Sequence, residues 1–530
     1  MDTFKDLHFP LAGIDLSQGF TQQPNRPIGD GRYARTTMEG VNVRAFEPSS
    51  DRARGGSRPG LARFIDSTVS GANLIQDLYP VIGVGYSAPG GGVQTSQSGR
   101  VVTLLAVSQG TVKVADAGAL AWTAVTNGTN ALITSGTIMS AVLNQKVYFA
   151  DGTNYKYYNP ATNAMAAWTA TASTLPVDGS GNTPRLIVTW RGRIVVSGLL
   201  NDPQNWFMSA VDDAANFDYS PLSITPTQAV SGNNSPLGLI GDVVTGLAPF
   251  SDDVMLFGGD HTLWMMRGDP MAGGQLDRIS DTIGMAWGEA WCKDPYGRIY
   301  FVSNRMGIYQ IEPGSLPKRV SQQIEQLVKD VNTGTHTIRL IWDDRFQGLH
   351  VFITKTAAAA AATHLFWESR TGAWWTDVFA NKNHNPLCCV TVDGNEPNDR
   401  VVVLGSWDGY VRFLDEAATR DDGYDIESSV MIGPLTTPDL DDLILKDLQA
   451  VLADTSGDVH FEVRVGETAE SAAVATPVLI GTWTRGRNFT NHVRQSGYAV
   501  FVRITSNSPW AMELIRARVS ALGKVRRRGR

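Results

Sequence analysis

The stretch FSDDVMLFGGDHTLWMM, residues 250–266, has two short apolar runs on either side of Gly-Gly-Asp, and a polar turn precedes them. Short apolar runs bounded by turn residues are typical of buried β-strands. Gly and Asp supply the backbone angles that a tight hairpin needs. The stretch therefore predicts two antiparallel strands.

The same pattern of turn, apolar strand, Gly- or Asn-rich turn and apolar strand recurs along much of the chain. Copies of it begin at Ser98, Asn144, Arg191, Ser251, Tyr296, Arg345 and Asn398. The starts are roughly 40 to 60 residues apart, which is the range of propeller blades. Blades stacked around an axis cover both of their faces. We therefore expect an all-β chain with a β-propeller of about seven blades over residues 75–423; unrelated hairpins in two β-sandwiches are the alternative.

Residues outside the repeat predict two further regions. Residues 1–74 are rich in Gly, Pro and Arg, and we expect an extended arm with the first strands, packed on something else. Residues 424–530 contain longer alternating stretches such as DVHFEVRVG and YAVFVRITS, which predict a β-sandwich-like domain. This domain ends in the basic run VRRRGR, residues 525–530. The run is either a solvated terminus or a contact for DNA or for an acidic patch on a partner.

Two segments interrupt the β pattern. Apolar residues recur near helical spacing over residues 315–332, Ser321 is a suitable N-cap, and Glu325 lies four residues before Lys329. We expect a surface helix docked on the propeller, with a groove for a partner as the alternative. The alanine run over residues 356–363 predicts a hairpin loop or a brief helical turn.

Charge and cysteine content narrow the functional classes. The net charge of −7 argues against a general nucleic-acid binder, which needs a basic surface. Three cysteines, two of them adjacent, make no disulfide framework and favour assembly in a reducing compartment. We see no signal peptide and no apolar run long enough to span a membrane.

The chain has no recognisable catalytic motif. It lacks GxSxG, HExxH and P-loop patterns, and its eight histidines show no convincing metal-ligand spacing. Adjacent aspartates lie where turns are expected and predict solvated turns; they are Asp252-Asp253, Asp343-Asp344, Asp421-Asp422 and Asp441-Asp442. Cys388-Cys389 predicts a buried strand pair. We therefore expect no enzyme activity, cofactor or metal site.

ESRTGAWW, residues 368–375, resembles the aspartate-box turn of sialidase-like propellers, but Arg370 stands near the place of the aspartate. The box is a structural turn in any case. This resemblance does not add a catalytic group.

Several segments, in order, carry a wider resemblance. They are residues 40–64, which contain the Pro59-Gly60 turn; residues 189–219, which begin with an Arg-Gly-Arg turn; residues 250–266; residues 281–311; and the closing residues 497–519. Together they resemble the tail nozzle family of short-tailed, podovirus-type bacteriophages. Members of this family are also called tail tubular protein B or packaged-DNA stabilisation protein.

The resemblance implies a structural virion protein in the phage tail, assembled in the host cytoplasm. It implies a hexameric ring below the portal and its adaptor, or head-completion, protein. Tail fibres or spikes attach around such a ring, which retains packaged double-stranded DNA and conducts it, without sequence preference, during ejection.

Within the arm, Arg52, Arg54 and Arg58 lie among Gly and Ser, too polar for a core, and we expect them to contact a neighbouring subunit or the adaptor. Two other functions stay open. One is a phage or host propeller that binds or cleaves glycans. The other is a cellular scaffold, for which Trp407-Asp408 is the single WD-type pair.

Overall fold

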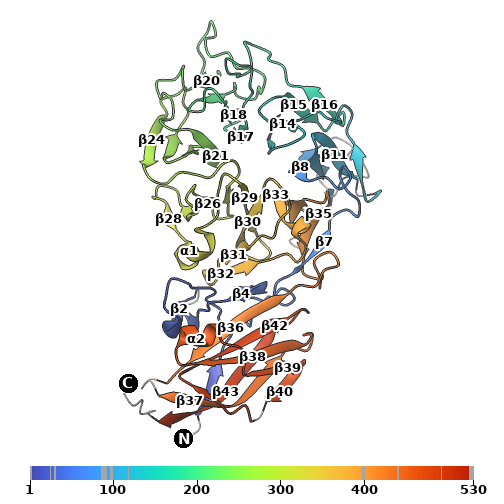
Figure 1. The fold of residues 1–530 in the computed structure, drawn as a ribbon. Helices are drawn as coiled ribbons and strands as arrows, with labels where there is room; N and C mark the ends of the chain where they lie inside the picture. Colours follow the sequence, from blue (N-terminus) through green and yellow to red (C-terminus); the bar gives the residue numbers. More distant parts are fainter. Residues whose placement is uncertain are drawn as a thin grey trace.

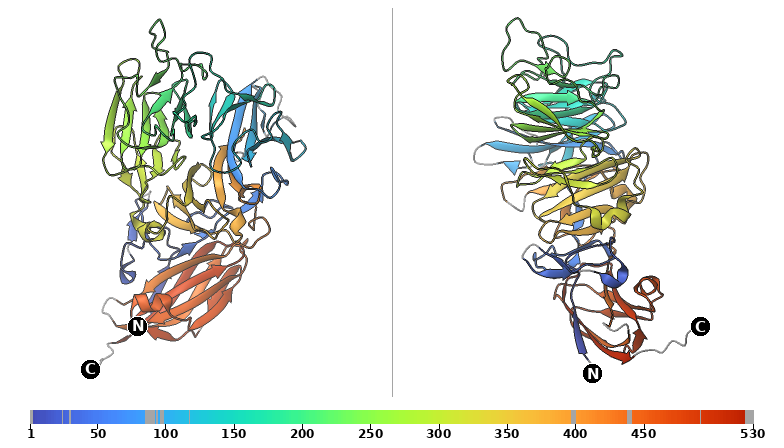
Figure 2. Two further views of the ribbon diagram at one scale, coloured as in Figure 1. Left: turned by 45° about the horizontal axis from the view of Figure 1, so that its top comes forward. Right: turned by 90° about the vertical axis from the view of Figure 1, so that its left-hand side faces the viewer.

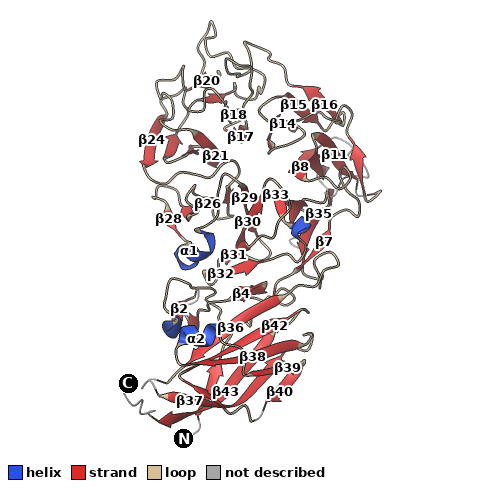
Figure 3. Ribbon diagram, viewed as in Figure 1, coloured by secondary structure: helices blue, strands red, loops and turns tan. Residues whose placement is uncertain are grey.

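The chain is built almost entirely from β-strands (Figure 3). The computed structural model describes residues 3–23, 25–28, 31–84, 92, 94–95, 99–116, 118–396, 400–437, 441–490 and 492–523. The basic run at residues 525–530 lies outside them. The described helices are short: η1 (Phe20–Gln22), η3 (Gln322–Ile324), α1 (Glu325–Val328), η4 (Lys382–His384) and α2 (Ala469–Val474).

Antiparallel sheets arranged around one axis form a β-propeller of seven blades, which confirms the predicted fold class (Figure 1). The innermost strands of successive blades contact each other all the way round, so the ring is closed. From the inner to the outer strand, the first four blades are β8 (Ile75–Val84), β10 (Arg100–Ser108), β11 (Thr111–Asp116), β12 (Ala121–Ala124); β13 (Met139–Leu143), β14 (Lys146–Ala150), β15 (Tyr155–Asn159), β16 (Ala164–Ala167); β17 (Leu186–Trp190), β18 (Arg193–Ser197), β19 (Trp206–Met208), β20 (Val230–Ser231); and β21 (Val244–Ser251), β22 (Val254–Gly259), β23 (Leu263–Arg267), β24 (Gln275–Ser280).

The last three blades follow in the same order. They are β25 (Trp291–Lys293), β26 (Ile299–Val302), β27 (Ile308–Ile311), β28 (Lys318–Arg319); β29 (His336–Asp343), β30 (Gly348–Lys355), β31 (His364–Glu368), β32 (Ala373–Asp377); and β33 (Pro386–Val392), β34 (Val401–Ser406), β35 (Val411–Asp415), β7 (Gly60–Arg63). A short strand, β9 (Gln94–Thr95), also pairs with β10.

Tight two-residue turns connect the inner pair of strands in the first three blades. Both central residues of each turn have positive φ, as a type I′ turn requires; they are Gln109 and Gly110, Asn144 and Gln145, and Arg191 and Gly192. Residues 250–266 form the predicted hairpin as β22 and β23. A Cβ at Gly258 would lie 2.3 Å from the Cβ of Met285, so this position needs glycine for the blade to pack.

The N-terminal segment closes the propeller. Its strand β7 is the outer strand of the seventh blade and pairs with β35, from Gly60 opposite Asp415 to Arg63 opposite Arg412. A Cβ at Gly60 would lie 2.5 Å from the carbonyl oxygen of Arg420, so only glycine fits there. These residues of the predicted arm are therefore part of the propeller.

The same segment also joins the propeller to the C-terminal domain. β4 (Gly40–Val41) pairs in parallel with β32 of the sixth blade and antiparallel with β36 (Ser428–Leu435), so one nine-stranded sheet runs through both bodies. Figure 2 shows the propeller edge-on with the C-terminal domain at its rim and the N-terminal segment at the junction. The remaining arm strands are β2 (Asn25–Pro27), β3 (Tyr33–Arg35), β5 (Val43–Arg44) and β6 (Gly56–Ser57).

The C-terminal domain is a sandwich of two sheets. In sheet order, the strands are β36, β42 (Ala499–Ser506), β38 (Val459–Gly466), β39 (Leu479–Trp483); and β1 (Thr3–Leu7), β43 (Met512–Gly523), β37 (Asp442–Leu452), β40 (Gly486–Thr490), with β41 (Gln495–Gly497) on β37. Val463 and Val502 from one sheet and Leu445 and Ile515 from the other are fully buried in one core. Burial of each such side chain contributes about 1.5–3 kcal/mol.

The segment predicted as a helix over residues 315–332 is mostly not helical. β28 is the outer strand of the fifth blade, and only η3 and α1 are helical. Ile324 and Val328 are buried in the core, which explains their apolar spacing. The Ser321 hydroxyl does not cap the helix; it accepts a hydrogen bond from the backbone N–H of Ile308 at 3.0 Å. The alanine run is the loop between β30 and β31.

Candidate functional site

Arg58, one of the three predicted interface arginines, is fully buried within the subunit. Its guanidinium donates to both carboxylate oxygens of Asp421, at 2.9 and 2.5 Å, and to Oδ1 of Asn42 at 2.8 Å. It also lies over the ring of Phe379, 4.9 Å from the centroid. The expectation that Arg58 contacts another subunit is therefore wrong. Its burial is possible because a carboxylate and several oxygens satisfy its donors.

A second buried arginine ties the N-terminal segment to the sixth blade. Arg44 donates to both oxygens of Asp377, at 2.8 and 2.7 Å, and stands 4.0 Å from the centroid of the Phe366 ring. Burial alone would raise the pKa of Asp377, but the charges of Arg44 and Arg58 outweigh it and lower this pKa to about 2. The two arginines thus fix the segment at the junction of propeller and sandwich.

The other two predicted interface arginines differ from each other. Arg54 is mostly buried and pairs with Glu47 at 3.0 Å and with Glu513 of the sandwich, so its role is also internal. Arg52 is exposed. Of the three residues, Arg52 alone has the exposure that a contact with another subunit requires.

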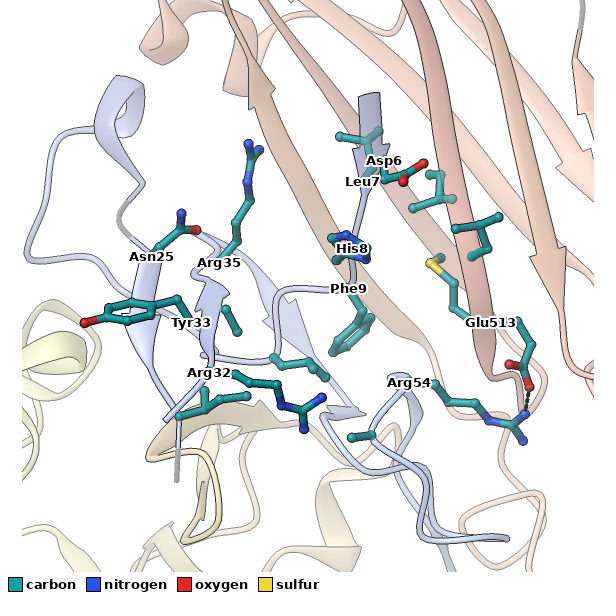
Figure 4. A pocket seen from close by; sticks show the side chains of 17 residues that line it. Asp6, Leu7, His8, Phe9, Asn25, Arg32, Tyr33, Arg35, Arg54 and Glu513 are labelled. Carbon is teal, nitrogen blue, oxygen red and sulfur yellow. Dashed lines mark hydrogen bonds and ion pairs between the residues drawn. The ribbon is translucent and has the colours of Figure 1, made fainter. Parts of the chain in front are cut away.

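A groove runs beside Arg54, between the N-terminal segment and the sandwich (Figure 4). Its volume is about 460 Å³. In Figure 4, Arg32, Tyr33 and Arg35 come from the β2–β3 hairpin on one side, and Arg54 and Glu513 form the opposite end. Tyr33 is 71% exposed, and Arg35 is exposed as well. A basic rim with a protruding aromatic ring is suited to binding a partner surface.

The adjacent aspartates do not all form solvated turns as predicted. Asp252-Asp253 is the turn between β21 and β22, but Asp421 and Asp343 are buried. Asp422 accepts from Arg412 at 2.9 Å and from Arg63 at 3.0 Å. These aspartates are turn residues whose charge is matched inside the fold. The geometry around them gives ion pairs rather than a nucleophile beside a base.

Cys388 is buried in β33 next to Cys389, as predicted, and burial raises the pKa of the Cys388 thiol well above its usual value. In the part of the chain that the structure describes, no three His, Cys, Asp or Glu side chains gather in a way that could hold a metal ion. In ESRTGAWW, Glu368 is buried and accepts from Arg370 at 2.7 Å, which makes this stretch a structural turn between β31 and β32.

A second cavity, of about 380 Å³, opens near the propeller axis where several inner strands begin. Arg185, Trp287 and His336 are among its lining residues. The Arg185 guanidinium lies 4.6 Å from the centroid of the Trp287 ring. The sequence analysis missed this pair because the two residues are far apart in the chain and neither belongs to a motif.

Searches against known proteins identify no family. No protein-family model matches the chain, and no curated protein matches it. None of the described helices is long and apolar enough to cross a membrane.

Similar solved structures have low identity to this chain. YCF48 from Cyanidioschyzon merolae is 10% identical with a TM-score of 0.39, and the match covers 68% of this chain and 100% of that one. The extracellular domain of BT4673 from B. thetaiotaomicron is 12% identical with a TM-score of 0.44, and the match covers 86% of this chain and 59% of that one. The extracellular domain of BT3049 from the same organism is 8% identical with a TM-score of 0.39, with coverages of 82% and 49%. We base no functional argument on these matches.

Proposed function

We propose that the chain is a structural subunit of a short bacteriophage tail, in the nozzle ring below the portal and adaptor. The resemblance of residues 40–64, 189–219, 250–266, 281–311 and 497–519 to the nozzle family motivates the proposal. The structural observation that supports it is the junction between the two bodies. There the propeller and the sandwich share one sheet, and Arg44 and Arg58 lock the N-terminal segment with buried ion pairs.

A subunit joined in this way moves as one block, which is what a ring under DNA pressure needs. Copies of a rigid block in head-to-tail contact close into a ring when the rotation between them fits. The net charge of −7 suits a bore that does not retain phosphates. In this proposal the groove of Figure 4 contacts the neighbouring subunit or the adaptor.

Electron microscopy of the purified protein, alone and mixed with the adaptor, tests the ring. We expect six-fold rings that form with the adaptor or without it, and an assembled tail with another symmetry would contradict the proposal. Arg35→Glu, at the exposed rim of the groove, is expected to block ring formation with the subunit still folded. Arg487→Glu, on an edge strand of the sandwich away from this groove, is the matched control.

In the nozzle role the protein needs no catalysis. We expect no cleavage when it is incubated with host surface polysaccharide, peptidoglycan or DNA. Reproducible turnover that is lost when one carboxylate is replaced by its amide would contradict this expectation.

A second candidate function is a propeller that binds or cleaves glycans. The cavity beside Arg185 and Trp287 favours its binding form, because the cavity offers cationic and hydroxyl groups at one face of the propeller. Binding of host polysaccharide by a protein that never forms rings would favour this candidate over the nozzle.

A further inference from the structure

The cavity near the propeller axis is built from several blades. Its lining includes residues 136–139 at the start of the second blade, Arg185 directly before β17, Trp287 before the fifth blade, and residues 333–339 at the start of the sixth. Inner strands that begin at one face bring these loops together around the axis. A volume of about 380 Å³ is within the range of small-molecule sites.

The charge of this cavity is unbalanced. Its described lining contains Arg185 and Arg339 but no aspartate or glutamate. Partial burial lowers the pKa of Arg185, and no acidic group acts against it. By contrast, carboxylates raise the pKa values of Arg58, Arg298 and Arg370. The ordinary arrangement in this molecule is an arginine paired with a carboxylate, and Arg185 departs from it.

Arg185 is held in place for a ligand. Its Nε donates to the carbonyl oxygen of Gly198 at 3.2 Å, and the guanidinium stacks on Trp287. Both contacts fix the plane of the fork, so less side-chain freedom is lost when an anion binds.

Arg339 is the second cation at the cavity. Its side chain is 3% exposed, and Nη1 lies 3.3 Å from the Glu289 carboxylate. Among the described residues, Nη2 has no hydrogen-bond partner, although a buried donor of this kind is normally satisfied. The arginine is thus only partly neutralised by protein groups.

The rest of the lining is neutral and polar. Thr137, Thr333 and Thr337 bring hydroxyl groups, and Gly136 and Gly334 leave backbone groups uncovered. Hydroxyl and backbone groups pair with other hydroxyl groups as donors and as acceptors. Such a lining suits a ligand with several hydroxyls better than a bare anion.

We propose that this cavity binds a carboxylate-bearing sugar unit, free or as part of an acidic polysaccharide. The Arg185 fork pairs with the ligand carboxylate through two parallel N–H···O bonds, the geometry that guanidinium and carboxylate share. The threonine hydroxyls and loop backbone pair with the sugar hydroxyls. This inference is independent of ring formation, so it stands or falls separately from the nozzle proposal.

Titration calorimetry of the full chain with glucuronate, glucose, acetate and inorganic phosphate tests the site. Glucose is the matched neutral probe, because it lacks the carboxylate. We expect glucuronate to bind about 10- to 100-fold more tightly than glucose, the range of a charge-assisted contact. We also expect acetate and phosphate to bind more weakly than glucuronate. A glucuronate-containing polysaccharide, added in a separate arm, distinguishes a polymer unit from a free sugar.

Arg185→Met keeps the stem that packs on Trp287 and removes the fork, so it is expected to lose the preference for glucuronate. Arg278→Met is the matched control, since Arg278 also lies over a tryptophan, 5.7 Å from the Trp264 ring centroid, but pairs with Asp281 at 2.6 Å. Circular dichroism confirms that both variants are folded. No binding by any probe, equal binding of glucose, equal binding of phosphate, or unchanged binding in Arg185→Met would overturn the proposal.

Discussion

Replacing Arg58 with methionine leaves the Asp421 carboxylate buried without its cation. The wild-type guanidinium makes two bonds to Asp421 and one to Asn42, and both members of the ion pair have 0% exposed side chains. Breaking a buried pair by removing one partner costs about 3–5 kcal/mol. The methionine preserves most of the packing on Phe379, so this loss is chiefly electrostatic.

Urea unfolding followed by tryptophan fluorescence measures the change in the free energy of unfolding. Arg58→Met is expected to be about 3–5 kcal/mol less stable than the wild type. Asp421→Asn combined with Arg58→Met removes both charges, and it is expected to lose about 0.5–3 kcal/mol less than the sum of the two single losses. Arg52→Met, an exposed arginine in the same segment, is the control and is expected to stay within about 0.5 kcal/mol of the wild type.

An opposite result would restore the role that the sequence predicted for Arg58. If Arg58→Met unfolds at the wild-type urea concentration but fails to form rings, Arg58 acts between subunits and the buried pair does not stabilise the fold. Additive losses in the double variant would likewise show that Arg58 and Asp421 are not coupled.

Four further predictions concern pH dependence, propeller closure and assembly. The pKa of Asp377 is about 2 in the folded chain against a usual 3.8, so its stabilisation is complete above about pH 4 and lost as pH falls towards 2; Asp377→Asn should flatten urea midpoints in this window, and an unchanged slope would count against the pair. Burial lowers the pKa of His364 from 6.5 to about 4, so stability should fall as pH drops between these values, and His364→Gln should abolish that slope. Gly60→Val should release the closing strand at a cost of about 1–3 kcal/mol, seen as new cleavage of the N-terminal segment in limited proteolysis, whereas wild-type resistance would refute the closure. Arg52→Glu should leave stability within about 0.5 kcal/mol and weaken assembly of the ring with the adaptor, and normal assembly would remove Arg52 from the interface.

The blades could be predicted from the sequence because their signals are local. Turn pairs such as Gln109-Gly110 and Arg191-Gly192 lie next to the strands that they connect, so turn chemistry and apolar runs repeat together. The sandwich was predictable for the same reason, since its long strands alternate apolar and polar residues.

The pairings between distant segments could not be predicted. Nothing around Arg58 indicates burial, because its neighbours are Gly, Ser and Pro, and its partner Asp421 is encoded near the other end of the propeller. The helix over residues 315–332 was overestimated because Ile324 and Val328 satisfy a helical period while packing on the blades. The Arg185–Trp287 stack likewise depends on blades meeting at the axis, which a single sequence does not encode locally.

The pairing of β1 with β43 joins the first described strand of the chain to the last one. A ribosome that adds ~5–20 residues per second needs roughly half a minute to two minutes for a chain of 530 residues. During that time the strand that will close the propeller and the strand that will complete the sandwich have already been synthesised but lack their partners. Unpaired strand edges of this kind are prone to aggregation. A prematurely terminated chain therefore keeps at least one open edge, which makes completion of synthesis itself a checkpoint before the subunit is fit to assemble.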